Sequence, residues 1–416
     1  MMAGTVDPLF DLDVVEDPHA YLAQLRATDP VHEIPGTGTF LVTSMDLIHE
    51  VVANPAVYSS VSTQFLHHRA NEGCPGLRSA APGMELADGQ GAVLATADPP
   101  DHGRQRRVVS RCLSTSAMQA MEPEFRALVD LALDDALPKG RIEWMRDVAE
   151  PLPMIMVARI LGLPDELAPQ LKAHGYASVE AIGGFVTDER LAELGAPMTN
   201  VGPIVDAYLA ARAAGSFDAT TLIGVCAQAV ERGELSDEEA MFILFLLLSA
   251  GGESTTSLTG TAVRILAERP DLQARLRAEP SLIPAFVEEA CRIDPPFRGH
   301  YRRVVADTNL GGTPVTAGST LVLAWPAANR DPDRFENPDD IDLDRPNPRQ
   351  HVGFGWGIHL CVGAPLARVE AKVALEQLLA RTTFFAVDPS APPLRHHVSL
   401  MVRRLVELPL VVETTD

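Results

Sequence analysis

The stretch Phe354-Gly355-Trp356-Gly357-Ile358-His359-Leu360-Cys361-Val362-Gly363 is the most informative part of the sequence. Its glycines predict a turn in which the backbone approaches a flat group closely, and a helix is expected to begin near Ala364. The free amides and the dipole of a helix N-terminus stabilise a thiolate at Cys361. The alternative is a glycine-rich turn whose buried cysteine serves only as a small hydrophobic residue. A lone thiolate is a poor zinc site, but it suits an axial bond to haem iron.

A long apolar helix is the second unusual feature. Ser236 and Glu239 form a capping box, and the helical pattern continues to about Glu268, before Arg269-Pro270 ends it. Such a helix is on the order of 50 Å long, and because it is apolar on nearly all sides we expect it to cross the middle of the protein. Its centre, residues 250–255, holds two glycines, an acid and two hydroxyls. Glycines weaken a helix and buried polar groups need partners, so function rather than stability is expected to set this segment.

The chain as a whole reads as mainly α with a smaller β portion. Helical patterns fill most of residues 98–295 and 364–381, whereas strand patterns occur near 30–60, 300–325 and 395–412. Residues 73–91 are rich in Gly, Pro and Ala and predict a long loop. No repeat or linker divides the chain, so residues 1–416 are expected to form a single domain.

The composition argues against several classes of protein. The 416 residues carry a net charge of −22 and are 46% hydrophobic, as in ordinary globular proteins. The acidic field disfavours nucleic-acid binding. The longest apolar run, Met241–Leu248 continuing through Ala250, is shorter than the ~20 residues of a membrane span. No signal peptide pattern is visible, and five widely spaced cysteines do not suggest disulfides. We therefore expect a soluble cytoplasmic protein that binds neither membrane nor nucleic acid.

The cysteine stretch resembles the haem loop of the cytochrome P450 family of haem-thiolate monooxygenases. The family pattern Phe-x-x-Gly-x-x-x-Cys-x-Gly is matched at Phe354, Gly357, Cys361 and Gly363, with a chance probability on the order of 0.001. The resemblance implies a soluble enzyme of bacterial type with the P450 fold. Haem b, iron protoporphyrin IX, would lie between the long helix and the cysteine loop with its following helix, with Cys361 as the iron ligand.

Further motifs extend the resemblance over nearly the whole chain. Glu289 and Arg292 match the family's Glu-x-x-Arg signature and precede Asp294-Pro295-Pro296. The resemblance implies that these two residues and Arg345 form a buried structural ion triad. Losing one partner of a buried charge pair costs roughly 3–5 kcal/mol, so loss of a member should lower the amount of haem-bound protein.

Four residues are expected around the haem propionates. His102 and Arg106 are one helical turn apart on a helix opened by Asp98, and the resemblance assigns them, with Arg302 and His359, to the propionates. Because Arg303 differs from Arg302 by one place, the choice between these two arginines stays open.

The long helix carries the expected proton-handling residues, Glu253, Ser254 and Thr255. An alcohol backed by a carboxylate is a suitable proton relay for oxygen activation. The family usually has Thr where this chain has Ser254, which keeps the hydroxyl but loses the methyl that restricts its rotamer. We expect Ser254 to be the alcohol, and the adjacent Thr255 remains an alternative.

The resemblance also implies a substrate pocket. It would be lined by Leu246, Leu247, Ala250, Gly251, Pro296, Phe297 and Leu400. These side chains favour a small apolar substrate, although the sequence does not identify it. Arg298 and His300 would hold a substrate carboxylate if they faced the cavity.

Electrons are expected from separate proteins. The sequence has no Gly-x-Gly-x-x-Gly fingerprint for flavin or nicotinamide, so the resemblance implies a ferredoxin and a ferredoxin reductase. A basic patch facing an acidic partner is predicted from Arg104, Arg107, Arg111, Arg349, Arg368 and Lys372.

The resulting hypothesis is a monooxygenase that inserts one oxygen atom of O2 into a small organic substrate. The alternatives are a peroxide-using enzyme of the same fold, an enzyme that reduces a bound small molecule, and a haem-thiolate sensor without turnover. Retention of an acid–alcohol pair argues against the peroxide-using and reducing variants.

Overall fold

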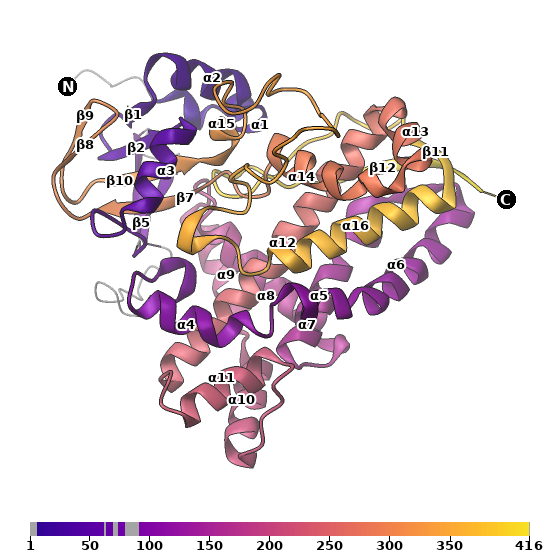
Figure 1. Cartoon of the computed structure of the whole chain (residues 1–416), viewed down its shortest axis with the longest axis horizontal. Coiled ribbons are helices and arrows are strands. Elements are labelled where there is room, and N and C mark those ends of the chain that lie inside the picture. Colours follow the sequence, from indigo (N-terminus) through magenta and orange to yellow (C-terminus); the bar gives the residue numbers. More distant parts are fainter. Residues whose placement is uncertain (1–5, 62–63, 70–73, 80–90, 416) are drawn as a thin grey trace.

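A computed structural model describes residues 6–61, 64–69, 74–79 and 91–415. Helices fill the right and lower parts of Figure 1, and the larger sheet lies at the upper left. The helices are α1 (Leu12–Glu16), α2 (His19–Thr28), α3 (Met45–Ala53), α4 (Asp101–Ser110), α5 (Thr115–Ala120), α6 (Glu122–Ala136), α7 (Pro151–Leu161), α8 (Ala168–Ala181), α9 (Asp188–Thr199), α10 (Gly202–Ala214), α11 (Leu222–Glu231), α12 (Asp237–Glu268), α13 (Pro270–Ala278), α14 (Ile283–Ile293), α15 (Trp325–Ala328) and α16 (Ala364–Arg381).

The strands form small sheets beside the helices. They are β1 (Val31–Ile34), β2 (Thr39–Val42), β3 (Tyr58–Ser59), β4 (Gln64–Arg69), β5 (Cys74–Ser79), β6 (Arg141–Glu143), β7 (Gly299–Val304), β8 (Thr308–Leu310), β9 (Thr313–Val315), β10 (Thr320–Ala324), β11 (Thr382–Val387) and β12 (Pro409–Thr414). The largest sheet has the order β1-β2-β10-β7-β3, and β11-β12-β6 form a second. The mainly α architecture with a smaller β portion agrees with the sequence prediction.

The predicted long helix is α12, which crosses the centre of the molecule (Figure 1). Its capping box is formed: the Ser236 hydroxyl accepts from the Glu239 amide at 3.0 Å, and the Glu239 carboxylate accepts from the Ser236 amide at 2.9 Å. A Cβ at Gly252 would lie 1.9 Å from Sδ of Met154 in α7. A side chain at Gly252 would therefore force Met154 to move where α7 crosses α12.

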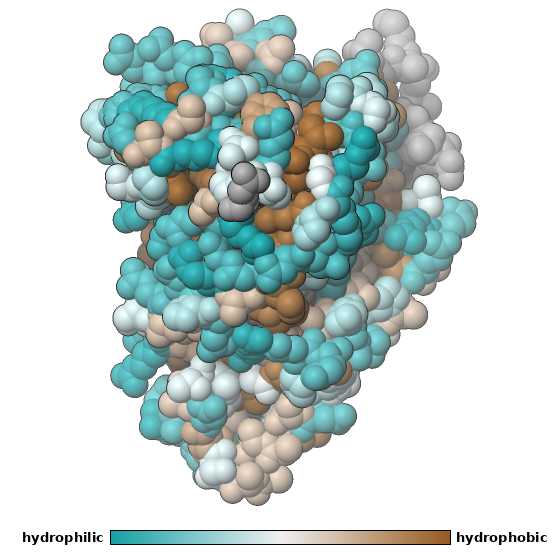
Figure 2. All heavy atoms as spheres, turned by 90° about the vertical axis from the view of Figure 1, so that its right-hand side faces the viewer, coloured by the Kyte–Doolittle hydropathy of each residue, from teal (hydrophilic) through white to brown (hydrophobic). Residues whose placement is uncertain are grey.

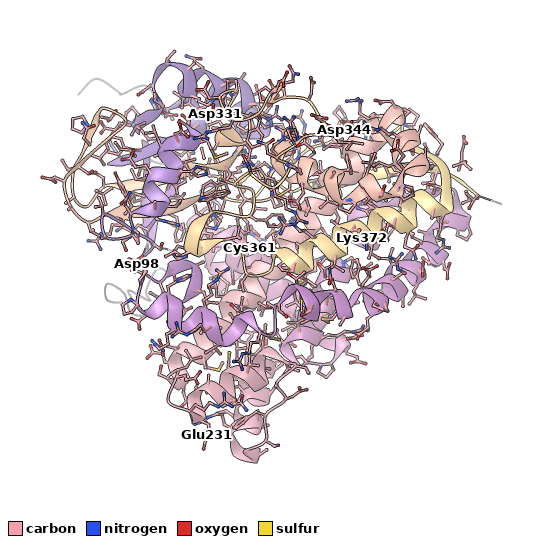
Figure 3. All side chains as sticks on the ribbon, viewed as in Figure 1. Asp98, Glu231, Asp331, Asp344, Cys361 and Lys372 are labelled. Atoms are coloured by element: carbon pink, nitrogen blue, oxygen red, sulfur yellow. The ribbon has the colours of Figure 1, made fainter. Side chains whose placement is uncertain are left out.

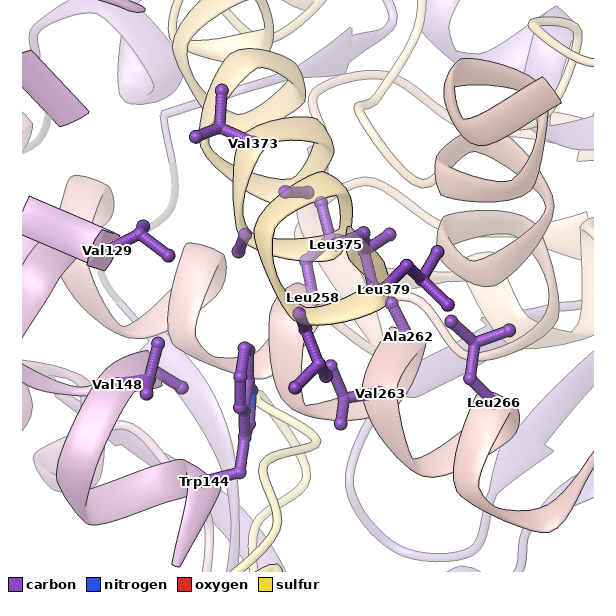
Figure 4. Close-up of a cluster of buried hydrophobic side chains, with 14 of the residues drawn as sticks. Val129, Trp144, Val148, Leu258, Ala262, Val263, Leu266, Val373, Leu375 and Leu379 are labelled. Atoms are coloured by element: carbon purple, nitrogen blue, oxygen red, sulfur yellow. The ribbon is translucent and has the colours of Figure 1, made fainter. Parts of the chain in front are cut away.

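By length and composition α12 would also suffice to cross a membrane, but 50% of its most apolar window is buried inside the protein. Leu258, Ala262 and Leu266 of α12 pack with Leu375 and Leu379 of α16 in the main hydrophobic core (Figure 4). Burying each large side chain contributes about 1.5–3 kcal/mol. The helix is thus a core element of this fold.

The surface is mixed on the face drawn in Figure 2. Hydrophobic residues there form small groups between hydrophilic ones. This face has no broad apolar area.

Several elements differ from the sequence prediction. Strand β5 lies within the predicted loop 73–91, of which residues 73 and 80–90 fall outside the described part, and β6 interrupts the predicted helical bulk. In the predicted β stretch 395–412 the regular strand begins only at Pro409. Before it, the backbone forms isolated β-bridges rather than a regular strand, and the side chains of Arg403 and Arg404 form buried ion pairs with Asp294 and Glu253. Strand β11 follows α16 directly and was not predicted.

Candidate active site

Cys361 closes a tight loop at the start of α16, near the middle of the molecule (Figure 3). The loop turns through Gly355 and Gly357, whose φ angles of 72° and 67° favour glycine. The Cys361 amide donates to the Phe354 carbonyl at 2.8 Å. Cys361 is exposed, whereas Cys112, Cys226 and Cys291 are buried free thiols.

The electrostatic setting of the Cys361 thiol combines opposing effects. Loss of hydration raises the pKa of the thiol. Four groups lower it: the amides of Gly363 and Ala364 and the charges of Arg106 and Arg368. A thiolate here therefore has hydrogen-bond donors and positive charge around it, but it lacks a direct counter-ion. A bound cation such as haem iron would supply that charge.

The four expected propionate partners lie in one cluster. The His102 and His359 rings are 4.3 Å apart, and Arg106 donates to the Leu360 carbonyl beside Cys361 at 2.6 Å. Burial, followed by the charge of Arg302 and its neighbours, lowers the pKa of His359 to about 3. Burial also lowers the pKa of Arg302 to about 10.

This cluster fits acidic groups. Its members repel one another, and Nδ1 of His359 is buried without a hydrogen-bond partner while Nε2 contacts the Ser60 hydroxyl at 2.9 Å. The two carboxylates of a haem would relieve both deficits. Arg302 is buried in strand β7, whereas Arg303 lies on the exposed side of the same strand. The burial of Arg302 favours it over Arg303 as the propionate partner.

The expected ion triad is assembled around Glu289. Oε1 accepts from Nε of Arg292 at 2.8 Å and from Nε of Arg345 at 2.9 Å, and Oε2 accepts from Arg292 at 2.9 Å and from the Asp342 amide at 2.9 Å. Both guanidinium groups lie over the Phe335 ring, 5.3 and 5.7 Å from its centroid. Burial opposes ionisation, but these donors bring the pKa of Glu289 below its ordinary value. The charge is fully compensated.

Sequence reasoning missed a second buried acid on the same helix. Glu288 accepts from Nε2 of His351 at 3.1 Å and from Nε of Arg368 at 2.7 Å. Although burial raises it, these donors lower the pKa of Glu288 to about 2. Arg368 also lies 4.5 Å from the Phe354 ring centroid, so Glu288 braces the cysteine loop from behind. The signal available in the sequence was a second acid in the apolar helical pattern of α14.

The predicted basic patch is largely neutralised by acids. Arg349 and Arg368 pair with Glu288. Arg104 pairs with Glu239 at 2.6 Å, and Lys372 with Glu122 at 3.0 Å. Four of the six predicted basic residues are thus in ion pairs, and the positive charge available to a partner is smaller than the sequence suggested.

Glu253 on α12 is buried and only half satisfied. Its Oε1 accepts from Nε of Arg404 at 2.9 Å, whereas its Oε2 has no partner. Burial raises the pKa of Glu253, and the Arg404 charge opposes this rise. A carboxylate with one oxygen held and one open is suited to exchanging a proton.

The two candidate alcohols differ in their surroundings. The Ser254 hydroxyl donates to the Ala250 carbonyl at 2.8 Å and is partly exposed. Thr255 is buried and donates to the Gly251 carbonyl at 3.3 Å. The Thr255 hydroxyl is near Glu370 of α16, a fully buried acid whose oxygens have no well-formed hydrogen bond. Burial raises the pKa of Glu370 well above its ordinary value, and the Thr255 hydroxyl opposes this rise.

The predicted pocket residues fall into separate groups. Phe297 and Leu400 lie in one apolar cluster with Leu66 and Tyr301, and Pro296 is buried beside them with its carbonyl accepting from the Arg403 amide at 2.8 Å. The remaining residues are on α12, where Leu246 and Leu247 pack on a different cluster and Ala250 and Gly251 follow in the next turn.

Neither residue considered for a substrate carboxylate is free to turn. Arg298 donates to the Val15 carbonyl at 2.6 Å. Nδ1 of His300 accepts from the Trp325 indole at 3.0 Å. Arg298 thus contacts the N-terminal region through one nitrogen, while its Nε is buried without a partner, and His300 contacts α15.

Comparison with known proteins agrees with this geometry. The sequence profile of the family described as Cytochrome P450 matches residues 215–405. The chain is 38% identical over 413 residues to Cytochrome P450 144 of Mycobacterium tuberculosis, covering 99% of this chain and 93% of the relative. It is 30% identical to the Cytochrome P450 monooxygenase PikC of Streptomyces venezuelae, covering 97% and 94% of the two chains.

A solved structure shows the same fold. CYP109E1 from Bacillus megaterium, in complex with testosterone, superposes with a TM-score of 0.79 at 29% identity, over 96% of this chain and 98% of that one. The range matched by the family profile includes both α12 and the cysteine loop. The chain therefore belongs to the cytochrome P450 family.

Proposed function

We propose that this cytochrome P450 monooxygenase inserts one oxygen atom of O2 into a small apolar substrate. The reaction consumes substrate-H, O2, two electrons and two protons and gives substrate-OH and water. The proposal is carried by one observation: Glu253 keeps an unpartnered carboxylate oxygen next to the hydroxyl-bearing Ser254 on α12. A sensor without turnover has no need of a proton-transfer pair.

Haem b is the proposed cofactor, bound through Cys361. His102, Arg106, Arg302 and His359 would hold its propionates, and Phe354, Gly357 and Gly363 would shape the loop against it. Haem, when bound, supplies the binding and reduction of O2. The amides of Gly363 and Ala364 hydrogen-bond the cysteine sulfur and so help to keep it a thiolate.

Protons are proposed to pass from Glu253 to the Ser254 hydroxyl. Oε2 of Glu253 takes up a proton from water, and the hydroxyl passes one on by exchanging its bond to the Ala250 carbonyl for another acceptor. Serine can make this exchange because its side chain has no methyl to restrict the rotamer. Thr255 is the less suitable donor because it is buried toward Glu370.

The proposed substrate is small and apolar. Phe297 and Leu400 already share an apolar cluster, and Leu246, Leu247, Ala250, Gly251 and Pro296 would complete the pocket. The complex of the related CYP109E1 with testosterone supports an apolar ligand of this kind. Arg298 and His300 are engaged elsewhere, which argues against recognition of a substrate carboxylate.

Electrons are proposed to come from a ferredoxin and its reductase, and the enzyme to work in the cytoplasm. Two members of the predicted basic patch are best placed to steer an acidic partner, because the other four are in ion pairs. They are Arg107 in α4 and Arg111 at the C-terminal end of this helix. The free thiols of the described cysteines fit a reducing compartment.

Reconstitution with a surrogate ferredoxin and reductase tests the proposal. The expected result is substrate oxidation that depends on NAD(P)H and O2. A spin-state change on ligand binding without any product would favour the sensor, and product formed with peroxide alone would favour the peroxide-using enzyme.

A Ser254→Ala variant tests the proton route separately. We expect it to form less product per NAD(P)H, with the difference released as peroxide. Unchanged coupling would remove Ser254 from the mechanism, and Thr255→Ala serves as the matched control that should alter coupling less.

A further inference from the structure

A C-terminal hairpin brings a positive charge to the buried acid of α12. The hairpin, residues 396–405, is closed by a β-bridge between His396 and Leu405 and by a 2.8 Å bond from the His397 amide to the Arg404 carbonyl. Nε of Arg404 then donates to Oε1 of Glu253 at 2.9 Å. The two residues are 151 positions apart in the sequence.

Arg404 is itself held from two other sides. Its second guanidinium nitrogen donates to Glu150 at 3.0 Å, and its guanidinium lies 4.8 Å from the centroid of the Tyr176 ring. The Tyr176 hydroxyl is 3.0 Å from the Thr256 hydroxyl on α12. The guanidinium is therefore fixed by Glu150 just before α7, by Tyr176 of α8 and by Glu253 of α12.

The ion pairs form a path of decreasing exposure. Lys172 pairs with Glu150, and their side chains are 32% and 18% exposed. Arg404 and Glu253 follow at 9% each. The buried acid is thus connected to the partly exposed Lys172 by a continuous set of ion pairs.

The geometry of the Arg404–Glu253 pair differs from that of a structural pair. Glu289 uses both oxygens on its arginines, whereas Glu253 uses only Oε1 and leaves Oε2 buried without a partner. A buried oxygen without a hydrogen-bond partner destabilises the folded protein. Such a cost is expected where the oxygen has a task other than stability.

We propose that Arg404 is a positioning residue that holds Glu253 by one oxygen and turns the other toward proton exchange. This inference rests on the proposed monooxygenase function, which it deepens. The same hairpin places Leu400 in the apolar cluster with Phe297, so one short segment contacts both the proposed pocket and the proposed proton donor.

The charged surroundings of Glu253 set the expected pH effect. Arg404 favours its ionised form, while Glu150 and Glu180 disfavour it; Glu180 is paired with Arg190 at 2.7 Å. His397 and Lys172 complete the charged groups on the elements packed here. Removing the Arg404 charge therefore raises the pH at which Glu253 loses its proton, because the arginine favours the ionised carboxylate.

The test compares Arg404→Gln and Arg404→Lys in the haem-loaded protein. Product formed per NAD(P)H is measured across pH, and the infrared carbonyl band of protonated Glu253, assigned by its loss in Glu253→Gln, is titrated without turnover. In Arg404→Gln we expect the midpoint of the coupling–pH profile and the midpoint of the infrared titration to move to higher pH. In Arg404→Lys both midpoints should lie close to the wild-type values. Arg403→Lys is the matched control, because Arg403 pairs with Asp294 instead, and its midpoints should match the wild type.

Two results would overturn the inference. One is an infrared midpoint in Arg404→Gln equal to that of the wild type; if this variant does not retain haem, the same reading is taken on Arg404→Lys, which is then expected to shift by a smaller amount. The other is a fall in coupling on Arg404→Gln that is as large in a Glu253→Gln background as alone. If Glu253→Gln itself leaves coupling unchanged, the proposed proton route has failed, while the infrared titration still decides the role of Arg404.

Discussion

The acids behind the cysteine loop and the acids around α12 are buried to a similar degree but are treated in opposite ways. Glu288 and Glu289 on α14 have partners on all four carboxylate oxygens. Glu253 has one free oxygen, and Glu370 has no well-formed hydrogen bond at all. The paired acids of α14 hold the cysteine loop in place. The acids around α12 keep carboxylate oxygens without partners, and these oxygens can bind protons.

This difference follows from what each region must do. A buried carboxylate that is fully paired stays ionised and rigid. Its removal leaves the partner cations buried without a counter-ion. A buried carboxylate that lacks partners has a raised pKa and therefore takes up a proton more readily. The same residue type thus serves structure in one region and chemistry in the other.

The largest expected effect is that of Glu289→Gln. It leaves Arg292 and Arg345 buried without their acid, and we expect a loss of about 3–5 kcal/mol in the free energy of unfolding. Denaturant titration and haem content per chain measure it. Glu253→Gln, the matched change on α12, should cost far less stability and act on product per NAD(P)H instead. Equal losses of stability in the two variants would remove the distinction between the regions.

Glu288→Gln should have the next largest effect, and it depends on pH. The folded-state pKa of about 2 is lower than the ordinary 4.5, so this acid stabilises the folded protein above pH 4.5 by about 3 kcal/mol. That contribution disappears as the pH falls toward 2.

Acid titrations of stability check this prediction. The Glu288→Gln variant should be less stable at neutral pH and should lose less on acidification than the wild type. Glu376→Gln, which removes a surface acid paired with Arg126, is the control and should change stability by less than about 1 kcal/mol. A Glu288→Gln curve parallel to the wild type would contradict the account.

The sequence predicted the first region better than the second. The haem-loop pattern and the Glu-x-x-Arg signature are local, so the family resemblance that they carry assigned roles to Glu289, Arg292 and Cys361. The capping box and the apolar run likewise predicted the 32 residues of α12 within one position at its start. Local patterns report helices and loops because the interactions that form them are local.

The contacts of α12 were not predictable because they join distant parts of the chain. Nothing near Arg404 marks it as the partner of an acid 151 residues earlier. Arg368 was interpreted as a surface charge because its acid, Glu288, lies 80 residues away. The role of Glu370 depends on how α16 packs against α12. The helical pattern of α16 predicts which side of the helix is buried, but not which residues of α12 that side contacts.

The smallest expected effect is that of Glu370→Leu. Replacing a buried acid without well-formed hydrogen bonds by an apolar side chain of similar size should leave stability unchanged or raise it by about 1 kcal/mol. The midpoint of chemical unfolding measures this. A loss of more than 1 kcal/mol would show that Glu370 has strong partners after all, and would make it resemble the acids behind the cysteine loop.

The bond between Cys361 and haem iron is the central claim, and the absorption spectrum of the reduced carbonyl complex tests it most directly. Wild-type protein and the control Cys291→Ser should both give the spectrum of thiolate ligation, and Cys361→His should give that of imidazole ligation. A wild-type spectrum of imidazole type, or a thiolate spectrum that survives in Cys361→His, would contradict the account.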